Sequence, residues 1–337
     1  MMTPDVRRLE ATYILPLRVD AEGPSERFQD LTDYLAWLAR VVDQVVVVDG
    51  SPAPTFARHH ERWRHLVQHV PPDPELVTEN GKVGGVLTGL RRAQHDRLII
   101  ADDDVRYDGR SIRLLLKALL SRDVVRPQNH FSPLPWHALW DTARILVNRT
   151  TGGDWPGTLG VRRSTLMAAG GYDGRVLFEN LELVRTIKAA GGSELVALDL
   201  FVPRRPPAVR HFWGQRVRQA YDEFARPGRL AIWLSLLPGL AMIVAKRSWV
   251  GLAGAGFAGI AVAEIGRRRG GGRAVFPATA SLVAPLWLIE RAIGVLLAVA
   301  ARLALGGMPY RDGILIRAAT PSRVLELRHA RARTNSR

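Results

Sequence analysis

Cysteine is absent from the 337-residue sequence. Its absence excludes disulfide bonds, thiolate metal sites and thiol catalysis, and it is compatible with a reducing compartment. The N-terminal segment 1–10 is charged and has no apolar stretch of the kind that a secretory signal peptide requires. We therefore expect the chain to begin in the cytosol.

Acidic residues are scarce relative to basic ones: 32 Asp and Glu face 47 Lys and Arg, which gives a formal charge of +15. The basic excess is concentrated in the segment 204–229 and in the segment after Arg311. Such clusters suit nucleic acid or an anionic membrane surface. Because they flank apolar segments, and no zinc-finger spacing or RNP-like aromatic pattern is present, anionic membrane lipids are the expected partner and no nucleic acid is expected.

Apolar runs dominate the C-terminal part of the chain. Four runs occupy 230–245, 249–265, 274–289 and 292–305. The first, 16 residues long, spans about 24 Å as a helix, against about 30 Å for a bilayer core, and flanking Lys and Arg can reach the interface. Four such runs are hard to bury in a small domain. We predict two to four membrane helices, with a soluble helical domain as the alternative.

These runs predict a three-part chain. A first domain occupies 1–228 with a juxtamembrane basic segment at 204–229, membrane helices follow at 229–305, and a basic cytosolic tail occupies 306–337. The positive-inside rule places the Arg-rich link 267–273 and the tail on the same side as the first domain, which requires an even number of crossings. Two hairpins satisfy this condition, and so does one hairpin followed by interfacial helices.

Short apolar runs alternate with helix-like stretches in the first domain. We expect strands at 11–17, 44–49, 66–70 and 97–101, and helices near 26–41, 82–95 and 111–121. This alternation predicts an α/β fold with parallel strands and crossover helices in a Rossmann-like sheet. Ligands of such sheets bind at the carboxyl ends of the strands, where Pro16, Asp49 and Asp102 to Asp104 fall.

Three adjacent carboxylates, Asp102, Asp103 and Asp104, follow the apolar run 98–101. They repel one another, so a fold rarely gathers them at a strand end without a cation. Side chains alternate along a strand, which lets Asp102 and Asp104 point the same way as ligands for Mg²⁺ or Mn²⁺ beside substrate phosphates. The alternative is a solvated acidic turn in which Asp104 or Asp108 caps the next helix.

Asp49 and Lys82 are weaker signals when each is taken alone. Asp49 ends a strand of four valines and can accept hydrogen bonds from a base or ribose, although an Asx turn is the better explanation of this residue alone. Lys82 follows Asn80 and Gly81 at a predicted helix start, where it can meet phosphate; the alternative is a solvated lysine after a glycine turn.

In this order, the strand with Pro16, the strand ending in Asp49, the Gly81-Lys82 pair and the aspartate triplet resemble family 2 glycosyltransferases of the GT-A fold, over roughly residues 10–225. The resemblance implies a nucleotide-sugar donor and a triplet at the family's DxD position. It assigns the cation, Mg²⁺ or Mn²⁺, to Asp102 and Asp104. The implied donor-binding residues are Pro16, Asp49, Lys82, Asp102, Asp103 and, from a later motif, Arg218.

That later motif begins at Gln215 and resembles the QxxRW motif of membrane-bound members such as ceramide glucosyltransferases and polysaccharide synthases. Gln219 replaces its Trp. The resemblance implies that Arg218 meets the diphosphate and Gln215 the acceptor or donor sugar. The alternative is a basic helix attracted to anionic lipid.

The segment 152–157 resembles the acceptor-side segment of the family, which implies acceptor contacts from Asp154 and Trp155. The ring of Trp155 can stack on a sugar or simply pack in a tight turn.

The family's usual general base, an Asp, is replaced by Asn180, which removes no proton at neutral pH. Glu179 is then the nearest base and Glu182, one turn along, is the reserve. The alternative is that Glu179 and Glu182 only stabilise the N-terminus of a helix.

The sequence thus predicts an inverting, metal-dependent hexosyltransferase, anchored in the cell membrane with its catalytic domain in the cytoplasm. Its acceptor is expected to be lipid-linked or membrane-associated, as in the synthesis of glycolipids or cell-envelope polysaccharides. A nucleotidyltransferase is the rival enzyme, although the segment 17–23 poorly matches the Gly-rich loop that such enzymes place after the first strand. A membrane-anchored nucleotide-sugar-binding protein without turnover is the second rival, motivated by Asn180.

Overall fold

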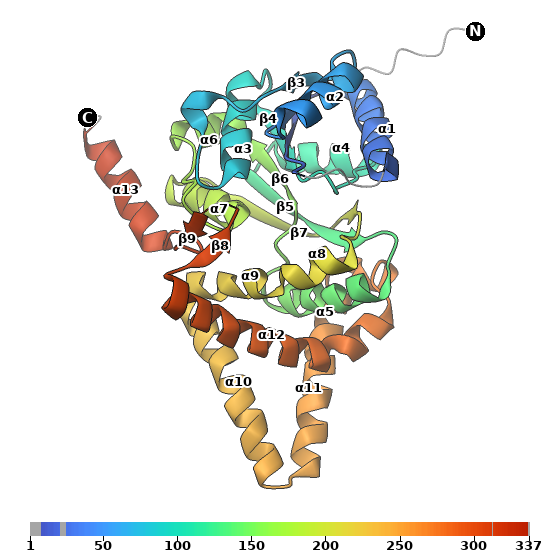
Figure 1. Cartoon of the computed structure of the whole chain (residues 1–337), viewed down its shortest axis with the longest axis vertical. Coiled ribbons are helices and arrows are strands. Elements are labelled where there is room, and N and C mark those ends of the chain that lie inside the picture. Colours follow the sequence, from blue (N-terminus) through green and yellow to red (C-terminus); the bar gives the residue numbers. More distant parts are fainter. Residues whose placement is uncertain (1–7, 21–24, 312, 336–337) are drawn as a thin grey trace.

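A seven-stranded sheet lies at the centre of the first domain of the computed structural model, which describes residues 8–20, 25–311 and 313–335 (Figure 1). The strand order is β3-β2-β1-β4-β6-β5-β7. The strands are β1 (Leu9–Leu17), β2 (Val42–Asp49), β3 (Gln68–Val70), β4 (Arg97–Ala101), β5 (Val124–Phe131), β6 (Thr158–Arg162) and β7 (Glu194–Arg204). The first four are parallel, and β6 runs antiparallel to both of its neighbours. The predicted α/β class is confirmed.

Helices connect these strands. They are α1 (Ser25–Val41), α2 (Ala53–Trp63), α3 (Gly81–Arg92), α4 (Gly109–Ala118), α5 (Trp136–Thr151), α6 (Arg163–Ala168) and α7 (Glu179–Ala189), with a short 3₁₀ turn, η1 (Pro74–Leu76). The parallel strands are buried on both faces, which explains their continuous apolar runs, such as the four valines of β2. The predicted helices are present, whereas the helices α2, α5 and α6 and the strands β5, β6 and β7 were not anticipated.

The N-caps of two helices bear on the site. Asp108 caps α4, because its Oδ1 accepts the backbone N–H of Ser111 at 2.6 Å. Asn80 caps α3, because its Oδ1 accepts the backbone N–H of Lys82 at 3.2 Å. Since Asp108 performs the capping, Asp104 of the triplet is left for another role.

Short helices follow β7: α8 (Val209–Gly214), α9 (Arg216–Ala220) and η2 (Tyr221–Ala225). Helices α8, α9 and α5 form a layer below the sheet (Figure 1). Beyond this layer α10 (Pro227–Ala245) and α11 (Trp249–Arg268) project as a hairpin, and after η3 (Arg269–Ala274) the helix α12 (Ala278–Leu305) lies across the base of that hairpin (Figure 1). All three are long and apolar enough to cross a membrane.

Helix α12 is continuous where the sequence suggested two apolar runs. The charged pair between these runs does not interrupt the helix, because both residues form ion pairs with the layer above. Glu290 Oε2 lies 2.8 Å from Arg216 Nη2, and Arg291 Nη2 lies 2.8 Å from Glu223 Oε1. These ion pairs fix α12 against the first domain.

The segment 306–337, predicted as a basic tail, contains the hairpin β8 (Met308–Tyr310) and β9 (Gly313–Leu315) and the helix α13 (Ser322–Asn335). It returns to the first domain, where the backbone N–H groups of Leu177 and Phe178 donate to the carbonyls of Arg317 and Ala318, each at 3.0 Å. Residues beyond the apolar helices therefore form part of the α/β unit.

The packing of α3 on β1 allows a stability test. A Cβ at Gly89 would overlap with the side chain of the fully buried Ile14. We expect Gly89→Ala to destabilise the fold by about 1–3 kcal/mol, because a close-packed interior cannot absorb the added methyl. Thermal unfolding of the purified protein would measure this. Gly228→Ala, which meets nothing within 4 Å, should leave the midpoint unchanged or slightly higher.

Candidate active site

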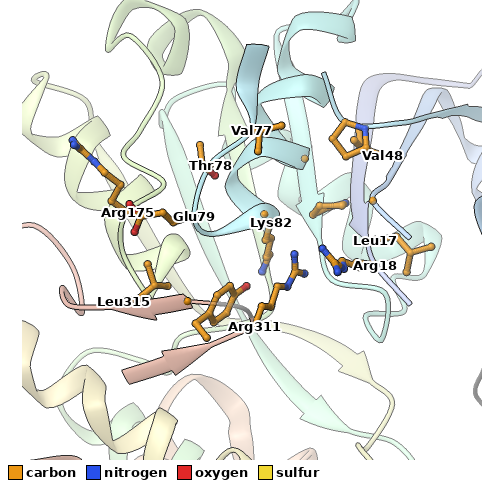
Figure 2. Close-up of a pocket in the computed structure, with 18 of the residues that line it drawn as sticks. Leu17, Arg18, Val48, Val77, Thr78, Glu79, Lys82, Arg175, Arg311 and Leu315 are labelled. Atoms are coloured by element: carbon orange, nitrogen blue, oxygen red, sulfur yellow. The ribbon is translucent and has the colours of Figure 1, made fainter. Parts of the chain in front are cut away.

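Three cavities meet at the aspartate triplet. The first cavity, about 850 Å³, lies between the ends of β1 and β2, the start of α3 and the hairpin β8–β9 (Figure 2). The second cavity, about 790 Å³, lies between α1, α2 and α8. The third cavity, about 190 Å³, lies beside Trp155 and the start of α7. Asp102 lines all three cavities, Asp103 the first two and Asp104 the second.

A cation faces each carboxylate of the triplet. Lys82 forms a short ion pair with Asp102. Arg27 Nη2 lies 3.0 Å from Asp103 Oδ2, and Arg204 Nη2 lies 2.6 Å from Asp104 Oδ2. The repulsion among the three acids is therefore offset by side chains from α3, α1 and β7.

Asp104 is the most constrained of the three acids. Burial raises the pKa of its carboxyl, the neighbouring charges of Asp102 and Asp103 add to the rise, and Arg204 opposes it. Its Oδ1 is buried, with no hydrogen-bond partner among the described residues. A buried carboxylate oxygen without a hydrogen-bond partner, beside a second carboxylate, suits a hard divalent cation. Such a cation would take its other oxygen ligands from phosphate and water.

Lys82 connects the triplet to the predicted base. Its Nζ contacts Asp102 and also lies 2.6 Å from Glu179 Oε1. Burial alone would lower the pKa of Lys82, but the two carboxylates outweigh it and raise this pKa well above its usual value. The ammonium is therefore charged throughout the physiological range.

The two predicted bases have different environments. Glu179, the first residue of α7, lines the third cavity together with Asn180. Glu182 is fully buried and lines none of the three cavities, and its Oε2 accepts the backbone N–H of Thr320 at 2.6 Å. Glu182 therefore anchors the C-terminal segment, and of the two predicted bases Glu179 is the one that lines a cavity.

Asp49 is turned away from the first cavity, which its neighbours Val48 and Gly50 line. Its Oδ2 accepts hydrogen bonds from His59 Nδ1 at 2.6 Å and His69 Nε2 at 3.1 Å. Its Oδ1 accepts the backbone N–H of Ser51 at 2.9 Å, which is the Asx turn that the sequence offered as an alternative. A contact between Asp49 and a nucleotide stays a prediction.

The Asp49, His59 and His69 side chains also form a possible metal-binding group, with ligand atoms within 4.8 Å of one another. The hydrogen bonds between them already satisfy these atoms. Burial alone would raise the pKa of Asp49, but the hydrogen bonds from the two histidines and Ser51 hold it well below its usual value. This group therefore stabilises the end of β2 as an ionised carboxylate.

Of the residues predicted to bind the acceptor, one is buried in the scaffold and two line cavities. Asp154 is buried, and its Oδ1 accepts hydrogen bonds from Arg144 at 2.6 Å and Asn148 at 2.9 Å. Its carboxylate therefore fixes the segment before β6 to helix α5. Trp155 lines the third cavity, with the guanidinium carbon of Arg126 at 4.0 Å from its ring centroid. Gln215 lines the second cavity.

Pro16 lines the first cavity, as a donor-binding residue should, whereas Arg218 lines none of the three. Arg218 Nη1 donates to Gln215 Oε1 at 3.2 Å. Its guanidinium carbon lies 4.5 Å from the ring centroid of Tyr310 in β8. Arg218 therefore touches the hairpin that borders the first cavity, and a direct contact with the diphosphate stays a prediction.

Sequence reasoning missed several residues of this site. Arg204 stands in the Arg-rich segment that the sequence did indicate, but its pairing with Asp104 depends on the end of β7 lying beside the segment that follows β4, where Arg204 forms a bridge with Val105. The hairpin residues Tyr310 and Arg311 line the first cavity although more than two hundred residues separate them from the parts of the chain opposite. No local pattern indicates such a contact.

No family model matches the sequence, and no curated protein is significantly similar to it. Several solved structures resemble the chain. A mannosyltransferase from Pyrobaculum calidifontis, in complex with GDP-Man and Mn²⁺, is 19% identical over 87% of this chain and 88% of its own, with a TM-score of 0.49.

Glucosyl-3-phosphoglycerate synthase from Mycobacterium tuberculosis, in complex with Mn²⁺, UDP and phosphoglyceric acid, is 16% identical over 60% of this chain and 73% of its own, with a TM-score of 0.39. Mannosyl-3-phosphoglycerate synthase from Rubrobacter xylanophilus is 13% identical over 61% and 70%, with a TM-score of 0.39. At these identities and TM-scores, the function of this chain has to be inferred from its own side chains.

The environment of Asp49 predicts a pH-dependent contribution to stability. Because its folded pKa is lowered, this contribution is complete above the unfolded value of about 3.9 and is lost as the pH falls through the folded pKa. We expect Asp49→Asn to lower stability by about 1.5–3 kcal/mol near pH 7, and the difference from the wild type to shrink below about pH 4. Thermal unfolding as a function of pH would measure it. Asp33→Asn, at an exposed position of α1, should show no such difference.

Proposed function

We propose that this chain is an inverting, metal-dependent glycosyltransferase of the GT-A fold, similar to family 2, that transfers a sugar from a nucleotide-sugar to a membrane-associated acceptor. One observation carries the proposal: Lys82 bridges Asp102, which lines all three cavities, and Glu179, which lines the smallest. A donor-binding carboxylate, a permanent cation and a candidate base are thereby in direct contact.

The first cavity is the natural site for the nucleotide. Its volume of about 850 Å³ falls within the range of about 300–1,000 Å³ typical of small-molecule sites. Pro16 and Lys82 line it, and basic residues outnumber acidic ones on its walls. The diphosphate of a bound donor would lie beside the ammonium of Lys82.

Asp102 and Asp104 would hold Mg²⁺ or Mn²⁺, whose charge offsets the negative charge that develops on the leaving nucleoside diphosphate. The pyrophosphate also competes with Glu179 for the ammonium of Lys82. Donor binding therefore weakens the ion pair of Glu179 and makes its carboxylate a better proton acceptor.

The third cavity would admit the acceptor hydroxyl beside Glu179. The hydroxyl oxygen attacks the anomeric carbon from the face opposite the diphosphate, the bond to the diphosphate oxygen breaks, and Glu179 takes the hydroxyl proton. Asn180, which follows Glu179, donates through its Nδ2 to the carbonyl of Pro156 at 3.0 Å. Asn180 thus fixes the segment that carries Trp155.

Membrane attachment is supported by the exposure of the apolar helices. Only 6% of the apolar 18-residue stretch of α10 is buried, against 39% of the corresponding stretch of α12. An α10–α11 hairpin in the bilayer and α12 at its interface would give an even number of crossings, with the Arg-rich link 267–273 on the side of the first domain. The exposed Trp136 and Trp213 lie in the layer beside these helices, as interfacial aromatic residues do. This placement supports a lipid-linked or membrane-associated acceptor.

A nucleotide-sugar-binding protein without turnover is the second candidate, because Asn180 occupies the position of the usual base. Both candidates require donor binding at the first cavity. They differ in the release of nucleoside diphosphate, which only the enzyme performs.

Nucleoside diphosphate release tests the proposal. With UDP-, GDP- or dTDP-sugars, a lipid extract and Mn²⁺, we expect release from the solubilised protein that EDTA abolishes. Glu179→Gln should lower turnover by about 10²- to 10⁴-fold while donor affinity is kept, because only the proton acceptor is lost. Asp104→Asn should lower turnover and metal affinity together.

Glu75→Gln, at an exposed position outside the cavities, is the matched control and should behave as the wild type. Donor binding without release, unchanged in Glu179→Gln, would contradict the transferase and favour the binding protein.

The membrane hairpin has its own test. Met242 and Phe257 expose 59% and 72% of their surface, and each Asp placed in a membrane helix costs about 2.5–3.5 kcal/mol. We expect the double variant Met242→Asp and Phe257→Asp to shift from the carbonate-washed membrane fraction toward the supernatant. Leu120→Asp, at an exposed apolar position of the first domain, should stay in the membrane fraction. Equal behaviour of the two variants would contradict insertion of the hairpin.

A further inference from the structure

The hairpin β8–β9 forms one wall of the first cavity. Residues 310–311 and 313–317 line it opposite the ends of β1 and β2, and the side chains of Arg311, Lys82 and Arg18 point into the same space (Figure 2). The hairpin follows α12 in the chain and is not part of the sheet that carries the triplet. Its presence in the cavity therefore calls for an explanation.

Within the part of the chain that the structure describes, Arg311 is the cation of this cavity with no acidic partner. Lys82 pairs with Asp102 and Glu179, Arg18 with Asp20, and Arg175 and Arg317 with Asp173. Arg311 is exposed and forms no ion pair within 8–20, 25–311 and 313–335. An unneutralised guanidinium in a cavity is suited to a bidentate contact with phosphate.

The backbone holds Arg311 over the first turn of α3. Its φ of 52° lies in the left-handed region, which is uncommon for a residue other than glycine and persists only where the surroundings impose it. A Cβ at Gly81 would come within 2.5 Å of Arg311 Nη1, so the guanidinium lies directly above the residue that precedes Lys82. Two cations thus converge on one part of the cavity.

Tyr310 positions this arginine. Its hydroxyl donates to Asn80 Oδ1 at 3.1 Å, which ties β8 to the N-cap of α3. The guanidinium carbon of Arg218 lies 4.5 Å, and that of Arg311 5.6 Å, from the Tyr310 ring centroid. The same segment is held further along by Thr320 on Glu182 and by Arg317 on Leu177. The hairpin and the segment after it are therefore fixed at the start of α3, which carries Lys82, and at the start of α7, which carries Glu179.

We infer that the hairpin beyond the apolar helices is part of the donor site, with Arg311 binding the diphosphate of the nucleotide-sugar opposite Lys82 and Tyr310 positioning Arg311. This inference rests on the proposed function and adds a diphosphate contact from the C-terminal segment. It also gives Arg218 a role as support for Tyr310.

Direct binding of nucleotides tests the inference without relying on turnover. Titration calorimetry of the full-length protein in nanodiscs would compare UDP, GDP and dTDP with their monophosphates, each with Mn²⁺ and with EDTA. For the diphosphate that binds, Arg311→Gln should weaken affinity by about 10- to 100-fold, and the monophosphate less, because a charge-assisted hydrogen bond is lost. Arg311→Lys should retain part of the affinity, and Tyr310→Phe should lose less than Arg311→Gln.

Arg323→Gln, an exposed arginine of the following helix α13 that lines none of the three cavities, is the matched control and should bind as the wild type. Diphosphate affinity equal to the wild type in Arg311→Gln would overturn the inference while leaving the proposed function standing. If Arg311→Gln keeps its nucleotide affinity but, in detergent, binds anionic lipid vesicles more weakly than the wild type, the inference is overturned in favour of a lipid headgroup. A wild-type protein that binds none of the nucleotides would overturn the proposed function and the inference together.

Discussion

The ammonium of Lys82 is the interaction on which the site depends. Like charges at the end of β4 and at the start of α7 would otherwise repel one another in a partly buried space. One cation contacts both sides, Asp102 and Glu179, and burial makes that contact stronger than it would be in water. The glycines of α3 let this helix approach β1 closely, and this approach delivers Lys82 to the carboxylates.

Around that interaction the chain builds the site from segments far apart in sequence. Arg27 comes from α1, Arg204 from β7 and Arg311 from the hairpin after α12. Glu182 and Asp154, acidic residues near the cavities, instead hold backbone or arginine side chains. The same residue type therefore serves either the site or the scaffold, according to what faces it.

The sequence predicted the local parts of this arrangement well. Strand and helix positions follow from apolar runs and turn residues, and the triplet at the end of β4 follows from its adjacency in the chain. The sequence could not indicate that two histidines enclose Asp49 or that Thr320 binds Glu182, because these contacts depend on how distant elements pack. The antiparallel β6, the continuous α12 and the returning hairpin depend on the same long-range packing.

The return of the hairpin has a consequence for biosynthesis. Residues 308–317 leave the ribosome only after the whole of α10, α11 and α12 has been made. A growing chain therefore displays the triplet long before the opposite wall of its cavity exists. Completion of the pocket is deferred until the apolar helices have been synthesised, so a fragment that stops before them lacks the arginine that faces Lys82.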